Sequence, residues 1–322
     1  AAADVISRAP TKELTGQAVV GITRGIGYNA GVNIAGPITD NLGFRVGVQR
    51  FKTPSISDNL NGPDGAGSAT DNLYIEFQLE WHIGGFHIRN RATHFTYDNQ
   101  PGYPQMSRFN NGRDGNTSGV FGALAPNPQY GYTGPAPTKA GEISVDFAGF
   151  DRLRNNFQNI TNADLDLGFA TLYYVGGYQT YVASGSADLD LTPRASYDAA
   201  TVAPGWFAPG TQVSTDYRSN YLNDNYFLSQ EARLEGQAND RLAWILGFYY
   251  FKQHSDEQYW ENIPNAQDTL AHPNIGATAT PAAPNPRKAT YEQRNIYNID
   301  SKAIFGNIAL DITDTLTLDA GL

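Results

Sequence analysis

The sequence predicts an all-β chain, an antiparallel up-and-down transmembrane β-barrel that is incomplete, with about 11 strands, long extracellular loops and short periplasmic turns. Three observations predict it. The 322 residues include 19 Tyr, 16 Phe and 33 Gly but one Met, which favours strands and turns over helices. Successive segments alternate between apolar and polar residues, and the connections between them alternate between short and long.

The clearest strand covers residues 73–81, where every second residue is apolar. This two-residue period is that of a strand and not of a helix. The same period predicts strands near 28–35 and 44–49. Weaker patterns predict the remaining strands near 17–23, 86–97, 155–165, 169–183, 225–236, 242–252, 297–310 and 316–322.

The connections supply the more discriminating signal. Turn-forming residues fill short connections near 36–41, 82–85, 166–168, 238–241 and 311–315, whereas the long connections cover about 53–71, 98–154, 184–224 and 253–296. The connection at 24–27 is short where a long one is expected. In an up-and-down barrel, periplasmic turns and extracellular loops must alternate, but a soluble sandwich has no such requirement. The pattern therefore favours the barrel.

Composition excludes several other classes. No segment approaches the roughly 20 consecutive apolar residues of a membrane-spanning helix, whereas a barrel strand needs only about 10 alternating ones. The net charge of −10 argues against nucleic acid as a partner. Because the chain has no cysteine, disulfides, thiolate metal sites and a cysteine nucleophile are excluded.

Several segments of the chain, in their order and spacing, resemble one known family. The start, Asp4-Val5-Ile6-Ser7-Arg8-Ala9-Pro10, and the following Thr15-Gly16-Gln17 are similar to the end of the plug domain and to the first barrel strand of the TonB-dependent outer-membrane receptors. Gly36-Pro37-Ile38-Thr39-Asp40 resembles that family's first periplasmic turn. Two later hairpins resemble mid-barrel hairpins, one around 229–251 and the other around 305–322.

The resemblance implies a division of the chain into two parts. Residues 1–13 would be the C-terminal end of the plug domain and its linker, and residues 14–322 the N-terminal part of the barrel. The sequence departs from the family pattern in having no TonB box, almost no plug and about half of the 22 strands that the family implies. Ala1-Ala2-Ala3 also stands where the family has a glycine-rich lead. Both ends of the sequence are therefore expected to be cut.

The chain is not predicted to be an enzyme, and no cofactor is expected. It has no Gly-x-Ser-x-Gly motif and no phosphate-binding Gly-Lys-Ser/Thr loop. Glu76, Glu80, Glu231 and Glu235 occupy alternate strand positions, which a polar barrel lumen explains without catalysis. The five histidines are too scattered for a helical metal pair, so no metal site is predicted, although His87 could share a lumen face with Arg89 and Arg91.

Two sets of aromatic residues are expected to have different roles. Those near strand ends should form the girdles at the lipid headgroups: Trp81, Tyr97, Tyr174, Trp244 and Tyr250. The predicted ligand-binding residues are aromatic residues of the long loops, which could stack on a sugar or siderophore: Tyr103, Tyr130, Tyr132, Trp206, Tyr259 and Trp260. They could equally pin each loop against its neighbours.

The resemblance implies energy-coupled uptake of a scarce nutrient, such as a siderophore–iron complex, cobalamin or an oligosaccharide, in the bacterial outer membrane. The expected partners are a TonB-type energy-coupling protein acting through the missing N-terminal region, outer-membrane lipid and lipopolysaccharide, and the nutrient. Two alternatives remain open. One is a passive outer-membrane pore, and the other is a secreted carbohydrate-binding β-protein, in which the apolar strand faces would be buried in a sandwich.

Overall fold

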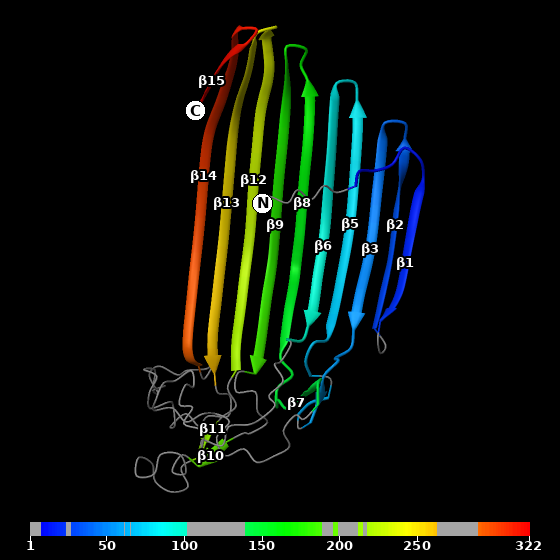
Figure 1. Ribbon diagram of the computed structural model, residues 1–322, viewed down its shortest axis with the longest axis vertical. Coiled ribbons are helices and arrows are strands. Elements are labelled where there is room, and N and C mark those ends of the chain that lie inside the picture. The colour runs from blue at the N-terminus through cyan, green and yellow to red at the C-terminus, as the bar shows by residue number, and fades with distance from the viewer. Residues whose placement is uncertain are drawn as a thin grey trace.

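The computed structural model describes residues 8–23, 27–60, 62–64, 66–101, 139–188, 196–198, 212–214, 218–262 and 289–322. Its main element is a sheet of 11 strands, each antiparallel to its neighbours (Figure 1). In sheet order these strands are β1 (Thr15–Thr23), β2 (Gly27–Thr39), β3 (Leu42–Thr53), β5 (Thr70–Ile83), β6 (Phe86–Asn99), β8 (Phe150–Asp166), β9 (Ala170–Asp188), β12 (Arg218–Asn239), β13 (Leu242–Asn262), β14 (Ala289–Thr313) and β15 (Leu316–Gly321).

The sheet follows the chain order without a crossover, which confirms the predicted up-and-down topology. It is not closed, because β1 and β15 form its two edges. Two small sheets lie at the loop end: β4 (Asp58–Asn59) pairs with β7 (Glu142–Ile143), and β10 (Ser196–Asp198) pairs with β11 (Gln212–Ser214). No helix in the described ranges is long and apolar enough to cross a membrane.

The short and long connections lie at opposite ends of the strands. In Figure 1 the tight turns between β5 and β6, between β8 and β9 and between β12 and β13 lie at the top, and the strand ends that the long connections join lie at the bottom. The short connection between β1 and β2 is the exception, because it joins two strands at the bottom. The predicted alternation is therefore confirmed. We call these two ends of the sheet the turn end and the loop end.

The later strands extend further than the sequence pattern predicts. The predicted loop at 253–296 is wrong over its two flanks, because β13 continues to Asn262 and β14 already begins at Ala289. The backbone ladder of these strands pairs Lys252 with Asp300 and continues to Asn262 and Ala289. Polar residues occupy both faces of this extension, so no apolar alternation marks it.

The polarity of the two faces of the sheet is the reverse of that in a soluble protein. On one face, which we call the outer face, large apolar side chains are exposed, for example Val32 at 48%, Phe77 at 42% and Leu246 at 53%. On the other, the inner face, polar side chains are buried, and Gln78 is 0% exposed and Ser255 2%. A water-soluble sheet would bury the apolar face.

The exposed apolar side chains of the outer face form a band next to the turn end. This apolar band covers the outward-facing residues of 73–81 in β5, 242–250 in β13 and 304–312 in β14. Each segment has about nine residues, which matches the roughly 9–11 that a tilted strand needs to cross the hydrocarbon core. Polar groups also lie within the band: Asn90 donates to Asn159 at 3.0 Å and to Thr161 at 2.7 Å, and the Tyr174 hydroxyl donates to Gln230.

Ion pairs follow the apolar band on its loop side. Arg50 and Lys52 pair with Asp71 at 2.7 and 3.2 Å. Further along the sheet the pairs are Asp98 with Arg152 at 2.9 Å and Asp256 with Arg294 at 2.6 Å. We call this group of charged residues the charged belt. It marks the depth at which the outer face changes from apolar to water-compatible.

One of the aromatic residues predicted to form the girdles, Tyr97, lies on the inner face. Trp81, Tyr174, Trp244 and Tyr250 belong to the outer face by strand alternation. Tyr97 is the register partner of Asn72 and therefore shares the inner face with Glu76 and Gln78, so its assignment to the girdle is wrong. Alternation along β6, without a register shift against β5, gives Tyr97 the same face as Arg89 and Arg91.

Candidate functional site

The structure describes two of the six predicted ligand-binding residues. Tyr103, Tyr130, Tyr132 and Trp206 lie outside the described residues. Tyr259 and Trp260 lie in strand β13 near its loop end, and not in a loop. Because they are adjacent in a strand, they point to opposite faces. Tyr259 shares the inner face with Ser255, and Trp260 shares the outer face with Leu246.

Tyr259 belongs to a group of aromatic and polar residues on the inner face at the loop end. Its hydroxyl donates to Glu261 Oε1 at 2.7 Å, and its ring meets the Tyr291 ring edge-on with centroids 6.0 Å apart. Tyr221, its register partner in β12, donates to Asp151. These residues lie beyond the charged belt, where burial raises the pKa of Glu261 and the pKa of Tyr259.

Sequence analysis missed Tyr221 and Tyr291 in this group. Both lie in strand extensions that the hydrophobic pattern does not reveal, in β12 and β14 respectively. Their proximity to Tyr259 follows from the register of three strands, in which Tyr221 is opposite Tyr259 and Tyr291 is opposite Glu261. The group offers ring faces next to a carboxylate, which is suited to a ligand with both apolar and hydrogen-bonding surface.

The carboxylates in the middle of the inner face are held by neighbouring side chains. Arg233 pairs with Glu231 at 2.7 Å and with Glu235 at 2.6 Å, all three on β12. Glu76 accepts hydrogen bonds from Tyr74 at 2.8 Å and from Gln78 at 2.9 Å. Glu76, Glu231 and Glu235, which occupy alternate strand positions, are therefore parts of a polar wall.

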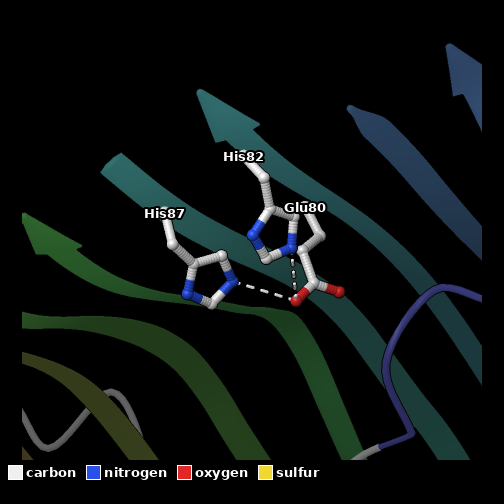
Figure 2. Close-up of side chains that lie close together, drawn as sticks. All are labelled: Glu80, His82 and His87. Atoms are coloured by element: carbon white, nitrogen blue, oxygen red, sulfur yellow. Dashed lines mark hydrogen bonds and ion pairs between the residues drawn. The ribbon is translucent and has the colours of Figure 1, made fainter. Parts of the chain in front are cut away.

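A second cluster lies on the inner face at the turn end. Figure 2 shows His82 of β5 and His87 of β6 both approaching one carboxylate oxygen of Glu80, which also lies on β5. Glu80 Oε1 is 2.9 Å from His87 Nε2 and 3.5 Å from His82 Nε2. The two imidazole rings are stacked, with centroids 4.2 Å apart and planes 9° apart. Asp164 of β8 contacts the other ring nitrogen of His87, Nδ1, at 2.8 Å.

The β5–β6 turn brings the two histidines together. Gly84 has a φ of +56°, which favours glycine, and it begins a tight turn with Gly85. This turn makes His82 and His87 direct register partners. Symmetric spacing about Gly84-Gly85 is a signal that could have identified the histidine pair from the sequence. Asp164 could not be found in this way, because its pairing with His87 depends on the register of β6 with a strand far along the chain.

Comparisons with known proteins identify the fold. Neither a protein-family model nor a curated protein matches the chain. Among solved structures, the siderophore receptor PiuA from Acinetobacter baumannii is similar with a TM-score of 0.57 and 12% identity, over 98% of this chain and 42% of that one. The FpvAI–pyocin S2 complex gives 0.52 with 14% identity, over 98% of this chain and 38% of that one.

A third similar structure is the ferripyoverdine receptor of the outer membrane of Pseudomonas aeruginosa, with a TM-score of 0.50 and 13% identity. It matches 98% of this chain and 37% of that one, so the chain spans less than half the length of each of these three proteins. At these identities the similarity concerns the fold. The resemblance inferred from the sequence is confirmed at that level: the chain has the barrel-wall fold of the TonB-dependent receptors of the bacterial outer membrane.

Proposed function

We propose that the chain is the first part of the barrel of an outer-membrane receptor that takes up a scarce nutrient, with energy supplied by a TonB-type protein. Further strands would close the sheet between β15 and β1, because lipid cannot satisfy the backbone groups of two open edges. The nutrient class remains a siderophore–iron complex, cobalamin or an oligosaccharide. The proposal assigns no catalytic role to any residue.

The observation that carries this proposal is the inverted polarity of the sheet. Apolar side chains are exposed over a band about nine residues deep, whereas polar side chains are buried on the opposite face. Such a sheet is stable where its outer face meets lipid. The same observation disfavours a secreted carbohydrate-binding protein, because that alternative needs the apolar face to be buried within a sandwich.

The N-terminal segment supports a receptor over a passive pore. Arg45, a buried residue of the inner face, donates from Nε at 3.3 Å and from Nη2 at 3.2 Å to the carbonyl oxygen of Ala9. Pro10 packs against Gly43 on the same face. The chain before β1 is therefore anchored to the inner face at the turn end. This anchoring is what we expect if residues 1–13 connect a plug domain inside the barrel to its first strand.

Uptake measurements test the proposal. The gene for the full-length protein is deleted from its bacterium and restored on a plasmid, in strains with and without a functional TonB-type protein. Growth is measured on ferric siderophores, cobalamin or oligosaccharides as the limiting nutrient. We expect growth on one nutrient to require both proteins. Uptake that needs no TonB-type protein, together with open-channel conductance in planar bilayers, would instead establish a passive pore.

We further propose that the nutrient binds at the loop end of the inner face. The group around Tyr259 and the predicted loop aromatics Tyr103, Tyr130, Tyr132 and Trp206 are the candidates. Support comes from the arrangement of Tyr221, Tyr259 and Tyr291, whose rings lie on the inner face beyond the charged belt. A ligand arriving from the loop side would meet these rings before the polar wall deeper inside.

A further inference from the structure

We propose that Glu80, His82 and His87 form a binding site for a divalent transition-metal ion of the Zn²⁺ class at the turn end of the inner face. Asp164 would orient His87 without binding the ion. The site depends on the β5–β6 hairpin and its neighbour β8, so the inference is independent of which nutrient is carried and of TonB coupling. The donor atoms are His82 Nε2, His87 Nε2 and a carboxylate oxygen of Glu80, all within 4.8 Å of one another.

The spacing of these atoms fits a single ion. Ligand atoms bound tetrahedrally at about 2.0–2.1 Å from Zn²⁺ lie roughly 3.3 Å from one another. Here Glu80 Oε1 is 2.9 Å from His87 Nε2 and 3.5 Å from His82 Nε2. Small side-chain rotations would centre an ion between the three atoms without moving the backbone ladder, in which His82 and His87 are already direct partners.

Asp164 supplies the feature that distinguishes this cluster from a chance grouping. Metal-bound histidines usually donate their second ring N–H to a carboxylate or carbonyl, which fixes the tautomer and aims the other nitrogen at the ion. Asp164 Oδ1 accepts in this way from His87 Nδ1 at 2.8 Å. The same contact leaves His87 Nε2 as the nitrogen that faces Glu80. Asp164 is therefore a positioning residue.

The donor set also indicates the class of ion. Two imidazole nitrogens and one carboxylate oxygen suit Zn²⁺ and its transition-metal neighbours, whereas Ca²⁺ and Mg²⁺ prefer sites made only of oxygen atoms. Three protein ligands leave the fourth tetrahedral position open for water. Access is sufficient, because the side chains of His82 and His87 are 59% and 30% exposed, while that of Glu80 is 17% exposed.

Direct binding measurements on the full-length protein test this proposal. The protein is purified in detergent, stripped with a chelator and titrated calorimetrically with Zn²⁺. A parallel titration with Co²⁺ follows the visible absorption of the tetrahedral ion. The variants are His82→Asn, His87→Asn and Asp164→Asn. The matched control is His254→Asn, which removes an outer-face histidine whose ring contacts Asn298 at 2.8 Å. Heat-modifiable mobility on gels verifies that each variant is folded.

We expect the tightest site to take one ion per chain. His82→Asn and His87→Asn should each weaken Zn²⁺ binding at least tenfold and abolish the Co²⁺ absorption. Asp164→Asn should weaken binding about tenfold while the Co²⁺ absorption persists, because the ligands remain. His254→Asn should bind like the parent. If the folded His82→Asn and His87→Asn variants bind Zn²⁺ as tightly as the parent, the site does not exist. Loss of binding in these variants with uptake unchanged would leave the receptor proposal intact.

Discussion

The outer face of the sheet has a different composition at the turn end and at the loop end of the same strands. Near the turn end, the outer face of β13 is apolar from Leu242 to Tyr250. Beyond Lys252, towards the loop end, the outward residues of the same strand become polar, with His254 and Asp256 in succession. The backbone pairing with β12 and β14 nevertheless continues to the end of the strand, through both environments.

This difference indicates that the strands are stabilised in different ways at their two ends. In lipid, exposed apolar side chains are at no disadvantage and every backbone group must be paired within the sheet. In water, side-chain contacts between neighbouring strands stabilise the ladder instead. In the extension of β13 these contacts are Asp256 with Arg294 at 2.6 Å and His254 with Asn298 at 2.8 Å. On the proposed placement of the sheet in a membrane, the charged belt is therefore where the surrounding medium changes from lipid to water.

The largest expected effect comes from placing a charge in the apolar band. Leu246 and Ile296 both lie on the outer face and are similarly exposed, at 53% and 52%, but Leu246 lies within the band and Ile296 beyond it. Leu246→Arg should destabilise the folded barrel by about 2–4 kcal/mol, because the charge enters hydrocarbon. Ile296→Arg should change stability by less than about 0.5 kcal/mol, since it faces water opposite Asp256.

The folded fraction of full-length protein in outer membranes, measured by heat-modifiable mobility on gels, compares these two variants. Equal folded fractions for Leu246→Arg and Ile296→Arg would contradict the assignment of the apolar band to lipid.

A smaller effect is expected at the inner face of the turn end. Arg45→Ala removes both hydrogen bonds to the Ala9 carbonyl and the contact with Asn33. Charge-assisted bonds of this kind contribute about 1.5–3 kcal/mol. The segment before β1 should therefore detach more often, and trypsin should cleave after Arg8 or Lys12 at least several times faster. Gln49→Ala, which removes an inner-face contact with Asn29, is the control. An unchanged cleavage rate in Arg45→Ala would show that this residue does not anchor the segment.

The sequence predicted the parts of the fold that lie in the apolar band. There, residues 73–81 alternate between an apolar and a polar face, so the pattern reports the strand directly. Beyond Lys252 both faces carry polar residues, and Gln253, His254 and Ser255 show no such pattern although they remain paired. This is why the strand count and topology were predictable and the loop ends of β12, β13 and β14 were not.

The sites were less predictable because they depend on register. Tyr259 was identifiable as an aromatic residue in a polar segment, but its neighbours Tyr221 and Tyr291 come from strands whose extensions carry no signal. The histidine pair was accessible through the Gly84-Gly85 turn. Asp164 was not, because the register of β6 against β8 contains an irregularity between His94 and Tyr97. Long-range pairing across a long connection leaves no trace in one sequence.

The loop end of β13 allows a test with two adjacent residues. Tyr259 lies on the inner face and Trp260 on the outer face. Tyr259→Ala should weaken nutrient binding by up to about tenfold, the size expected for the loss of one aromatic contact. Trp260→Ala should have a smaller effect, because a ligand held on the inner face cannot reach it. Binding is measured on purified full-length protein with the nutrient identified by the growth assay. A larger loss for Trp260→Ala than for Tyr259→Ala would move the ligand to the other face.

The smallest expected effect concerns the charge next to the proposed metal site. Arg89 is the register partner of Glu80 and lies on the same inner face. Its positive charge opposes a bound cation, so Arg89→Gln should tighten Zn²⁺ binding, by about twofold given the screening of a solvated face. Calorimetric titration against the parent at low ionic strength measures this change, and added salt should reduce it. Weaker Zn²⁺ binding in Arg89→Gln would mean that the arginine supports the Glu80 carboxylate instead of competing for it. In that case Arg89 would join Asp164 as a residue that positions the ligands.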